Sequence, residues 1–401
     1  MERFGGMTAL LLPRGVSLYL LASITVTYLA SSSAPTPLYP IYQRQWGFSP
    51  VAISLVFGVY AIAVLGALLV MGRLSDHIGR RPVLIGATAI QAATMFAFAE
   101  AQGLSDLIAA RIVQGLATGA GIAAVGAGML DMDPRRGAVA NSVAPASGTA
   151  LGGILGGLMV TYLPAPTHLV YFVFAAVFIA QIAALLFIPE VNPKREGAIA
   201  SLRPRLGLPV ATRQPLFVAI PALIAVWSLA GFYGSLAPSL VRTSFGLDSS
   251  LAGGISLFVL AGSAGLSVLA AQRLAARTLM IYGSTALVLG VALAVNSLYH
   301  SVAMFFLGTA LAGSGFGTAF QGAIRTVMPS AAPQERGGVL SVIFVVSYLA
   351  MGLPAVIAGY LVSRSGDVFS TAREFAAVVI MLAASALIGT LRTTHQQEEI
   401  K

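Results

Sequence analysis

Charged residues are scarce in this sequence, so those inside or beside long apolar runs are the candidates for chemistry. Only 9% of the 401 residues are charged, whereas 57% are hydrophobic. Arg111 lies within an apolar run, and Gln114 follows one helical turn later on the same face. A charge inside a membrane helix costs about 2.5–3.5 kcal/mol on insertion scales, so Arg111 is expected to face the protein interior. The alternative is a side chain that extends to the outer headgroups, because Arg111 lies near the start of its run.

A second concentration of charge, GRLSDHIGRRPVL at residues 72–84, separates two long apolar runs. It is typical of a short polar turn between two membrane helices, with its basic side chains in the headgroup layer. Glycine lacks a Cβ, so the chain can turn sharply here and a neighbouring helix can approach closely. A carboxylate near the N-terminus of another helix is favoured by about 0.3–1 kcal/mol. The residues expected to matter are Gly72, Asp76, Gly79, Arg80 and Arg81.

The composition indicates an integral membrane protein and argues against several functions. The mean hydropathy is +0.87, and soluble domains carry about 25% charged residues. Cysteine is absent and the four histidines are not clustered, so we expect no disulfide, no metal site and no cofactor. The net charge of +9 fits loops that face anionic lipid rather than nucleic acid. No G-x-x-x-x-G-K-[ST] segment occurs, which argues against a nucleotide-driven pump, and we expect no enzyme activity.

Twelve apolar runs have the length of about 20 residues or more that a membrane helix needs. They lie at about residues 15–38, 50–71, 82–101, 105–130, 137–162, 168–188, 214–238, 250–272, 278–297, 301–327, 337–362 and 371–391. The longest polar stretch, 190–213, divides the chain into an N-terminal half (1–189) and a C-terminal half (214–401). The sequence therefore predicts an all-α membrane protein whose two halves each contain six transmembrane helices.

The two halves resemble each other at low resolution. Arg136 precedes the fifth run, and Arg336 precedes the eleventh. The loop after the eighth run resembles a decayed copy of residues 72–84, with Arg277 in the place of Arg80. These correspondences predict two pseudo-symmetric six-helix bundles.

Basic residues also predict the topology. With both termini in the cytoplasm, the basic residues that face outward are only Arg44, Arg242, Arg364 and Arg373. Apart from Arg111, the other basic residues face the cytoplasm, as the positive-inside rule requires. We therefore expect a multi-pass protein of the cytoplasmic (inner) membrane.

A row of glycines lies in the fifth run, at Gly148, Gly152, Gly156 and Gly157. Glycines four positions apart share one helical face and allow close contact with a neighbouring helix. Generic helix packing is one interpretation of this row.

These segments resemble motifs of the major facilitator superfamily. The signature loop of that family, G-x-L-x-D-x-x-G-R-[RK]-x-x-L, is matched at Gly72, Leu74, Asp76, Gly79, Arg80, Arg81 and Leu84. Arg111, Gln114 and Gly115 resemble the R-x-x-Q-G motif, which the family links to proton coupling or substrate binding. The glycine row resembles the antiporter motif G-x-x-x-G-P-x-x-G-G, with Gly153 where that motif has proline.

The resemblance implies two sets of functional residues. A charge network closing the cytoplasmic gate would join the signature loop to Asp131 and, across the halves, to Arg336 or the helix N-terminus beside it. The alternative is a solvated loop with local ion pairs worth under about 1 kcal/mol each. Helices 1, 4, 7 and 10 line the pathway in this family. The candidate coupling or substrate residues are therefore Tyr28, Ser32, Arg111, Gln114, Trp227, Tyr233 and Gln321.

Three functions stay open on the sequence. The first is proton-coupled efflux (antiport) of a small amphipathic molecule such as a drug, by rocking of two bundles around a central site. The second is proton-coupled uptake of an organic acid or another metabolite. The third is a membrane sensor or assembly factor that does not transport. The glycine row favours the first, and Arg111 without an acid in mid-span keeps the second open.

The proton carrier is also open. A buried carboxylate is the usual choice, but none of the fourteen acids lies near the middle of a predicted span. Glu100, Asp106 or an acid at the cytoplasmic side could carry the proton, or coupling works otherwise. The expected partners are a small-molecule substrate, protons and the lipid bilayer, and we expect a monomer.

Overall fold

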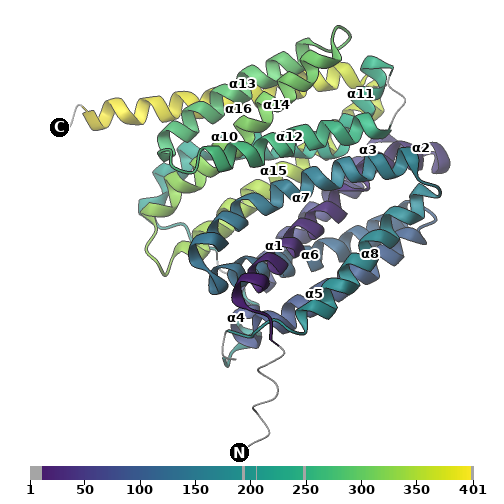
Figure 1. The fold of residues 1–401 in the computed structure, drawn as a ribbon. Coiled ribbons are helices and arrows are strands. Elements are labelled where there is room, and N and C mark those ends of the chain that lie inside the picture. The colour runs from purple at the N-terminus through teal and green to yellow at the C-terminus, as the bar shows by residue number, and fades with distance from the viewer. Residues whose placement is uncertain (1–10, 192–194, 205, 247–249, 399–401) are drawn as a thin grey trace, which may run out of the picture.

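The computed structural model describes residues 11–191, 195–204, 206–246 and 250–398, with side chains described up to residue 392. These residues form helices and connecting segments, without a strand (Figure 1). In this part of the chain, twelve helical segments are long and apolar enough to cross a membrane. The prediction of an all-α membrane protein with twelve spans is confirmed.

The helices of the N-terminal half contain the predicted signature loop and the Arg111 region. They are α1 (Arg14–Ser33), η2 (Thr36–Leu38), α2 (Tyr39–Trp46), α3 (Pro50–Met71), α4 (Ser75–Ile78), α5 (Arg80–Ala99), α6 (Leu104–Met132), α7 (Pro134–Tyr162) and α8 (Pro166–Leu185). The later elements are α9 (Ala198–Ser201), α10 (Val210–Ser235), α11 (Ala237–Phe245), α12 (Ser250–Ala270), α13 (Ala276–Asn296), α14 (Val302–Val327), η3 (Met328–Ser330), α15 (Arg336–Ser365) and α16 (Val368–Glu398).

Two spans are broken where the sequence predicts one continuous helix. The predicted helix over residues 15–38 consists of α1 and then η2, followed by α2. Pro35 and Pro37 lie at this break. The helix breaks here because proline lacks the N–H that would continue the helical hydrogen bonds. The predicted helix over 214–238 likewise divides, and Pro238 lies in the first turn of α11. Both breaks lie at the same end of the two halves.

Several helix starts are fixed by polar side chains. Ser49, Asp133 and Ser301 are the N-cap residues of α3, α7 and α14, and each side chain accepts a backbone N–H of the first turn. At the start of α16 the backbone N–H of Phe369 donates to Asp367, and this bond lowers the pKa of that carboxyl. The caps therefore fix where these spans begin.

The buried apolar side chains form two separate clusters. One cluster contains residues between 18 and 188, and the other contains residues between 216 and 386. Van der Waals packing within each cluster holds the helices of one half together, because lipid tails are as apolar as these side chains. The fold is thus two six-helix bundles, as the sequence predicts.

The two bundles meet along α7 with α12 and α3 with α15, and the first pair runs side by side in Figure 1. We call the end with residues 72–84 the loop end, and the opposite end, with α2 and α11, the far end. At the far end the backbone N–H of Val51 donates to Ser363 Oγ at 3.0 Å. Thr36 Oγ1 there donates to the Gly234 carbonyl at 3.3 Å. The bundles are therefore hydrogen-bonded to each other at the far end.

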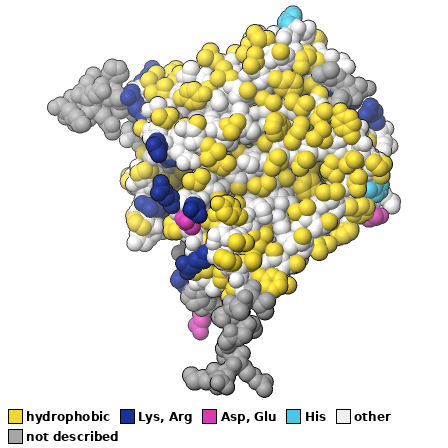
Figure 2. Space-filling model, in the orientation of Figure 1, with side chains coloured by type: hydrophobic (Ala, Val, Ile, Leu, Met, Phe, Trp, Pro, Cys, Tyr) yellow, Lys and Arg dark blue, Asp and Glu magenta, His cyan; other side chains and the backbone are white. Residues whose placement is uncertain are grey.

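The surface agrees with a membrane-spanning bundle. Figure 2 shows apolar side chains over most of the visible face, while most of the Lys and Arg side chains in view lie along its left edge. Large apolar side chains such as Leu266, Ile357 and Met381 are more than half exposed. Lipid tails are the solvent that such a surface fits.

The glycine row of α7 faces two different helices. A Cβ added at Gly148 would lie 2.5 Å from the Val26 carbonyl oxygen of α1, Gly152 also packs on α1, and Gly156 packs on Ala34 directly after it. A Cβ at Gly157 would lie 3.0 Å from Leu251 Cα of α12. Three glycines therefore let α7 approach α1 within its own half, and Gly157 lets it approach the other half.

We expect Gly152→Ala to destabilise the protein by about 1–3 kcal/mol, because its Cβ overlaps atoms of α1 that belong to backbone and cannot move away. The measurement is the thermal unfolding midpoint of the purified protein in detergent.

Gly66→Ala is the matched control, because a Cβ there meets no heavy atom within 4 Å. Alanine is favoured over glycine in a helix by about 0.8–1.0 kcal/mol, so the midpoint should stay or rise. Equal losses in both variants would contradict the packing role of Gly152.

Candidate functional site

Arg111 of α6 is buried, with 1% of its surface exposed. Its Nη1 donates to the Ser32 carbonyl at 3.0 Å and to Gln114 Oε1 at 2.6 Å. Its Nη2 donates to the Tyr39 hydroxyl at 2.7 Å. The guanidinium is thus held by neutral groups of α1, α2 and α6 inside the N-terminal half, and it does not extend toward the headgroups.

Two aromatic rings complete the surroundings of this charge. The guanidinium carbon of Arg111 lies 5.4 Å from the ring centroid of Tyr60 and 5.3 Å from that of Phe98. A desolvated cation over an aromatic face is stabilised by about 2 kcal/mol. In the part of the chain that the structure describes, Arg111 forms no ion pair, and its Nε is buried without a hydrogen-bond partner. The site therefore carries a positive charge with an unused donor.

The proline break of the first span prepares this site. Pro35 has no N–H to donate to the carbonyl four residues earlier, that of Ser31. Gln114 Nε2 donates to this carbonyl instead, at 3.4 Å. The break that Pro35 causes thus leaves a backbone acceptor for a side chain of α6. This side chain, Gln114, is also the one that accepts a hydrogen bond from Arg111.

Gln91 of α5 extends the polar network although the sequence does not single it out. Its Nε2 donates to Thr118 Oγ1 at 2.7 Å and to the Gln114 carbonyl at 3.3 Å. Its Oε1 is buried without a hydrogen-bond partner. A glutamine in the middle of a predicted span is the signal that could have found it.

The C-terminal half contributes an aromatic cluster around Trp227 of α10. The indole packs on Phe316 and Phe320 of α14, with centroids 5.9 and 5.4 Å away, and on Tyr348 of α15 at 5.5 Å. Trp227 Nε1 and Gln321 Oε1 are both buried without a hydrogen-bond partner. The cluster is an apolar surface with one unused polar atom, Trp227 Nε1, a common composition for a small-molecule site.

Two tyrosines lie on the helices that connect these groups of residues. Tyr60 belongs to α3 and Tyr348 to α15, and these two helices pack against each other between the halves. The Tyr60 hydroxyl also lies within reach of the Ser32 and Thr118 side chains. Tyr60 thus touches the Arg111 site, and Tyr348 touches the Trp227 cluster. Sequence reasoning missed both tyrosines, because a single tyrosine in an apolar run gives no clue to the face it occupies.

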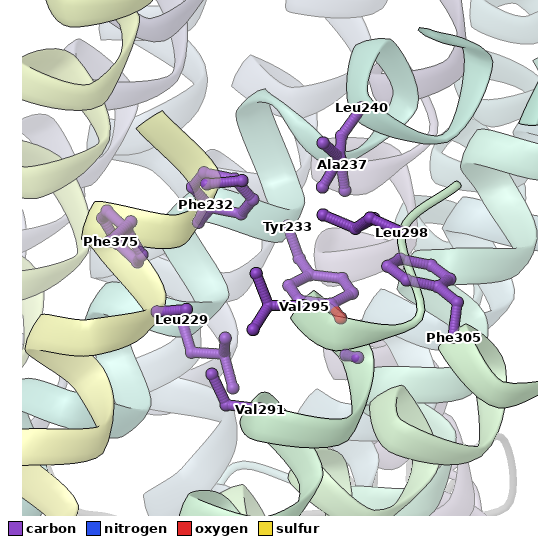
Figure 3. A pocket seen from close by; sticks show the side chains of 13 residues that line it. Leu229, Phe232, Tyr233, Ala237, Leu240, Val291, Val295, Leu298, Phe305 and Phe375 are labelled. Carbon is purple, nitrogen blue, oxygen red and sulfur yellow. The ribbon is translucent and has the colours of Figure 1, made fainter. Parts of the chain in front are cut away.

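Tyr28 and Tyr233 lie outside this set. The Tyr28 hydroxyl is bonded to Thr88 Oγ1 at 2.8 Å in the core of the N-terminal half. Tyr233 is bonded to Thr309 Oγ1 at 2.8 Å and lines an apolar cavity of about 40 Å³ inside the C-terminal half (Figure 3). Both phenols pack within their own bundle, with their hydroxyls already paired.

At the loop end Arg80 joins two acids. Its Nη1 donates to Asp76 Oδ1 at 2.5 Å and to Ser75 Oγ at 2.6 Å, and its Nε donates to Asp131 Oδ2 at 3.1 Å. The Arg80 side chain is 13% exposed, so solvent screens this network only partly. The three residues of the predicted gate thus contact one another within the N-terminal half.

Glu190 fixes the turn before α5, and sequence reasoning missed it. Its carboxylate accepts the backbone N–H groups of Arg80 at 3.0 Å and Arg81 at 2.8 Å, the first two of the helix. Gly79 adopts φ of +102° at this turn. This backbone conformation requires glycine, and a Cβ at Gly79 would lie 2.7 Å from Glu190 Oε2 and displace the carboxylate.

The remaining gate candidates take no part in this network. Arg336 is exposed at the start of α15 and, in the part of the chain that the structure describes, forms no ion pair with Asp76 or Asp131. The Arg81 side chain likewise has no ion pair there, and Gly72 has ordinary helical angles at the end of α3. An ion pair between Arg336 and the acids of the signature loop is thus absent among the described residues, and a link from this loop to Arg336 or to the N-terminus of α15 stays a prediction.

Comparisons with known proteins give the family. The model described as Major Facilitator Superfamily matches residues 21–353, and the chain belongs to this superfamily of transporters. The protein is a transporter rather than an enzyme.

Relatives are distant. The cephamycin export protein CmcT of Amycolatopsis lactamdurans is 34% identical over 139 residues, which are 33% of this chain and 28% of that protein. The chain therefore matches less than a third of that relative's length.

Solved structures show the same fold. A bacterial homologue of the human lysosomal transporter Spinster, in an inward-facing and unoccupied conformation, has a TM-score of 0.73 at 13% identity, over 94% of this chain and 97% of that one. A variant of the nucleoside transporter NupG has a TM-score of 0.71 at 14% identity, over 94% and 99%. The human organic anion transporter MFSD10 has a TM-score of 0.67 at 18% identity, over 94% and 100%. At these identities the likeness shows the fold alone.

We expect Glu190→Ala to loosen the signature loop, because two backbone N–H groups at the start of α5 lose their acceptor. Such charge-assisted hydrogen bonds contribute about 1.5–3 kcal/mol each. Hydrogen–deuterium exchange at the amides of residues 79–81 should therefore become about tenfold faster or more.

Glu196→Ala is the control. The bond of His77 goes to the backbone carbonyl of residue 196, which the substitution retains. Unchanged exchange in Glu190→Ala, or equal acceleration in both variants, would contradict the capping role.

Proposed function

We propose that this protein exports a small amphipathic molecule by alternating access, driven by proton antiport. The observation that carries the proposal is the position of the Arg111 site. It lies next to Tyr60 of α3, the helix that packs on α15 of the other half, and buried polar atoms without a partner occur in both halves. Rocking of two bundles about such a site would expose it to each side of the membrane in turn.

The proposed topology places the loop end in the cytoplasm. Arg80, Arg81 and the arginines that begin α7 lie at that end, and basic loops stay inside. The hydrogen bonds between the halves lie at the far end, so this arrangement would be open to the cytoplasm. The absence of an Arg336 pair in the described structure fits an open loop end, and the gate network would reach α15 when that end closes.

The proposed substrate is neutral or anionic. Arg111 has no counter-ion in the described structure, and a bound carboxylate would supply one. The aromatic cluster of Trp227 would take the apolar part of the same molecule. The partial match to a cephamycin exporter makes a cephamycin, a β-lactam with a carboxylate, the first compound to test.

The coupling residue is proposed among the acids at the ends of the spans. Asp131 contacts Arg80 at the loop end, whereas Glu100 and Asp106 flank the turn between α5 and α6 at the far end. Protonation of Asp131 would weaken the Arg80 network and so link the proton to the state of the gate.

Uptake of an organic acid with protons is the second candidate. The uncompensated charge of Arg111 favours it, since an acid substrate could bring both the negative charge and the proton. The two candidates differ in the sign of the pH gradient that drives accumulation. Flux into proteoliposomes, measured with gradients of either sign for a cephamycin and a panel of organic acids, distinguishes them.

We expect Arg111→Gln to weaken binding of an anionic substrate by about 10- to 100-fold, since hydrogen bonds to a charged group contribute about 1.5–3 kcal/mol. Binding of a cephamycin to the purified protein measures this. The exposed Arg364 at the far end gives the matched control, Arg364→Gln. Undiminished affinity in Arg111→Gln would remove Arg111 from the substrate site.

We expect Asp76→Asn to abolish net transport while expression and substrate binding stay near those of the wild type. The neutral amide pairs only weakly with Arg80, so the loop would no longer present its charge network when the gate closes. Proteoliposome flux and equilibrium binding are the two measurements. Glu374→Gln, at an exposed residue of α16, is the control, and normal flux in Asp76→Asn would refute the gate assignment.

A further inference from the structure

A second cavity lies at the loop end, between the two halves, and the proposed transport cycle does not use it. Its volume is about 740 Å³, within the range of about 300–1,000 Å³ of small-molecule sites. Apolar side chains of α1 and α7 form most of its lining, among them Leu18 and Val143, and Leu269 of α12 lies opposite them. The charged residues in the lining are Arg135 and Arg136.

The two arginines lie at the end of a span, where we expect lipid headgroups. They follow Pro134, the first residue of the span formed by α7, and the preceding span ends at Met132. Basic residues at the end of a span interact with anionic lipid. The ring of Tyr19, which is 66% exposed, lines the same cavity and is the kind of side chain enriched at the membrane interface.

The charge of this pair is only partly compensated. Asp133 accepts the backbone N–H groups of both arginines at 2.9 Å and lies 3.8 Å from Arg136 Nε. The Arg135 side chain forms no ion pair in the part of the chain that the structure describes. A net positive rim therefore adjoins an apolar wall, which matches a molecule with a negative head and an apolar tail.

We propose that this cavity binds an anionic phospholipid of the leaflet at the loop end. The phosphate lies against Arg135 and Arg136, and an acyl chain lies between Val143 of α7 and Leu269 of α12. A free phosphate would leave the apolar lining unfilled, and the bilayer supplies the lipid at this depth.

Such a lipid would also oppose closure of the loop end. Gly265 of α12 packs on Ala146 of α7, and the cavity begins on the loop side of this contact. Bringing Leu269 to Val143 would expel the acyl chain. This consequence rests on the proposed alternating access, whereas lipid binding itself does not.

The test is titration of the purified full-length protein with phosphatidylglycerol and with phosphatidylcholine of the same acyl chains, with bound lipids counted by native mass spectrometry. The wild type should prefer phosphatidylglycerol. Arg135→Gln/Arg136→Gln should lower its affinity for phosphatidylglycerol about tenfold and remove the preference. Val143→Trp, which fills the cavity and keeps both arginines, should lower the affinity for both lipids.

Arg273→Gln/Arg277→Gln is the matched control, because it removes two exposed charges from the same end but outside the cavity. It should bind phosphatidylglycerol as the wild type does. The proposal is overturned if Arg135→Gln/Arg136→Gln binds like the wild type, or if the control loses as much. Displacement of the lipid by millimolar inorganic phosphate would show a site for free anions and would also overturn it.

Discussion

A buried guanidinium without a counter-ion is the constraint on which the organisation of this bundle depends. Moving a charge into a low-dielectric interior costs several kcal/mol, and neutral groups must offset that cost. Here a backbone carbonyl, a hydroxyl, an amide and two aromatic faces surround Arg111. They come from α1, α2, α3, α5 and α6, so each of these five helices contributes a group that contacts Arg111. The kink in the first span contributes to the same site. Because Pro35 has no N–H, the Ser31 carbonyl is free to accept a hydrogen bond from Gln114.

Glycines allow the two halves to stay in close contact without interlocking side chains. Gly148 and Gly152 fix α7 on α1, whereas Gly153 and Gly157 face α12. The position where related exporters have proline is thus occupied by a glycine at the contact between the halves. Close backbone contact there relies on van der Waals packing, and no side-chain ion pair joins α7 to α12 in the described structure. Such a contact can serve as the surface about which the bundles rock.

Hydropathy alone predicts the twelve spans, because each must satisfy its backbone in lipid. The Arg80 network was also predictable, since charge is rare and its motif is contiguous. Tyr60 and Tyr348 were not, and neither was the inward packing of Tyr28. Their helices are apolar on nearly every face, so no periodicity tells which face meets the other half and which meets its own bundle. Glu190 escaped prediction because it lies 110 residues from Arg80 in the sequence, and only the folded turn brings them together.

No described span has a carboxylate in its middle. In the proposed function, binding of the substrate and binding of the proton therefore belong to different residues. In the proposed function Arg111 provides a fixed charge for an anion, and the titratable acids lie at the ends of the spans, where Asp131 touches Arg80. In the proposed cycle a proton therefore acts on the gate and not on the substrate. The link between them must then pass through the relative position of the bundles. An anion that bridges Arg111 and the Trp227 cluster would favour the arrangement in which both halves reach it, and the loss of charge at Asp131 would favour an open loop end. Proton and substrate would thus shift the equilibrium between the arrangements of the bundles in different directions, although they bind at different sites.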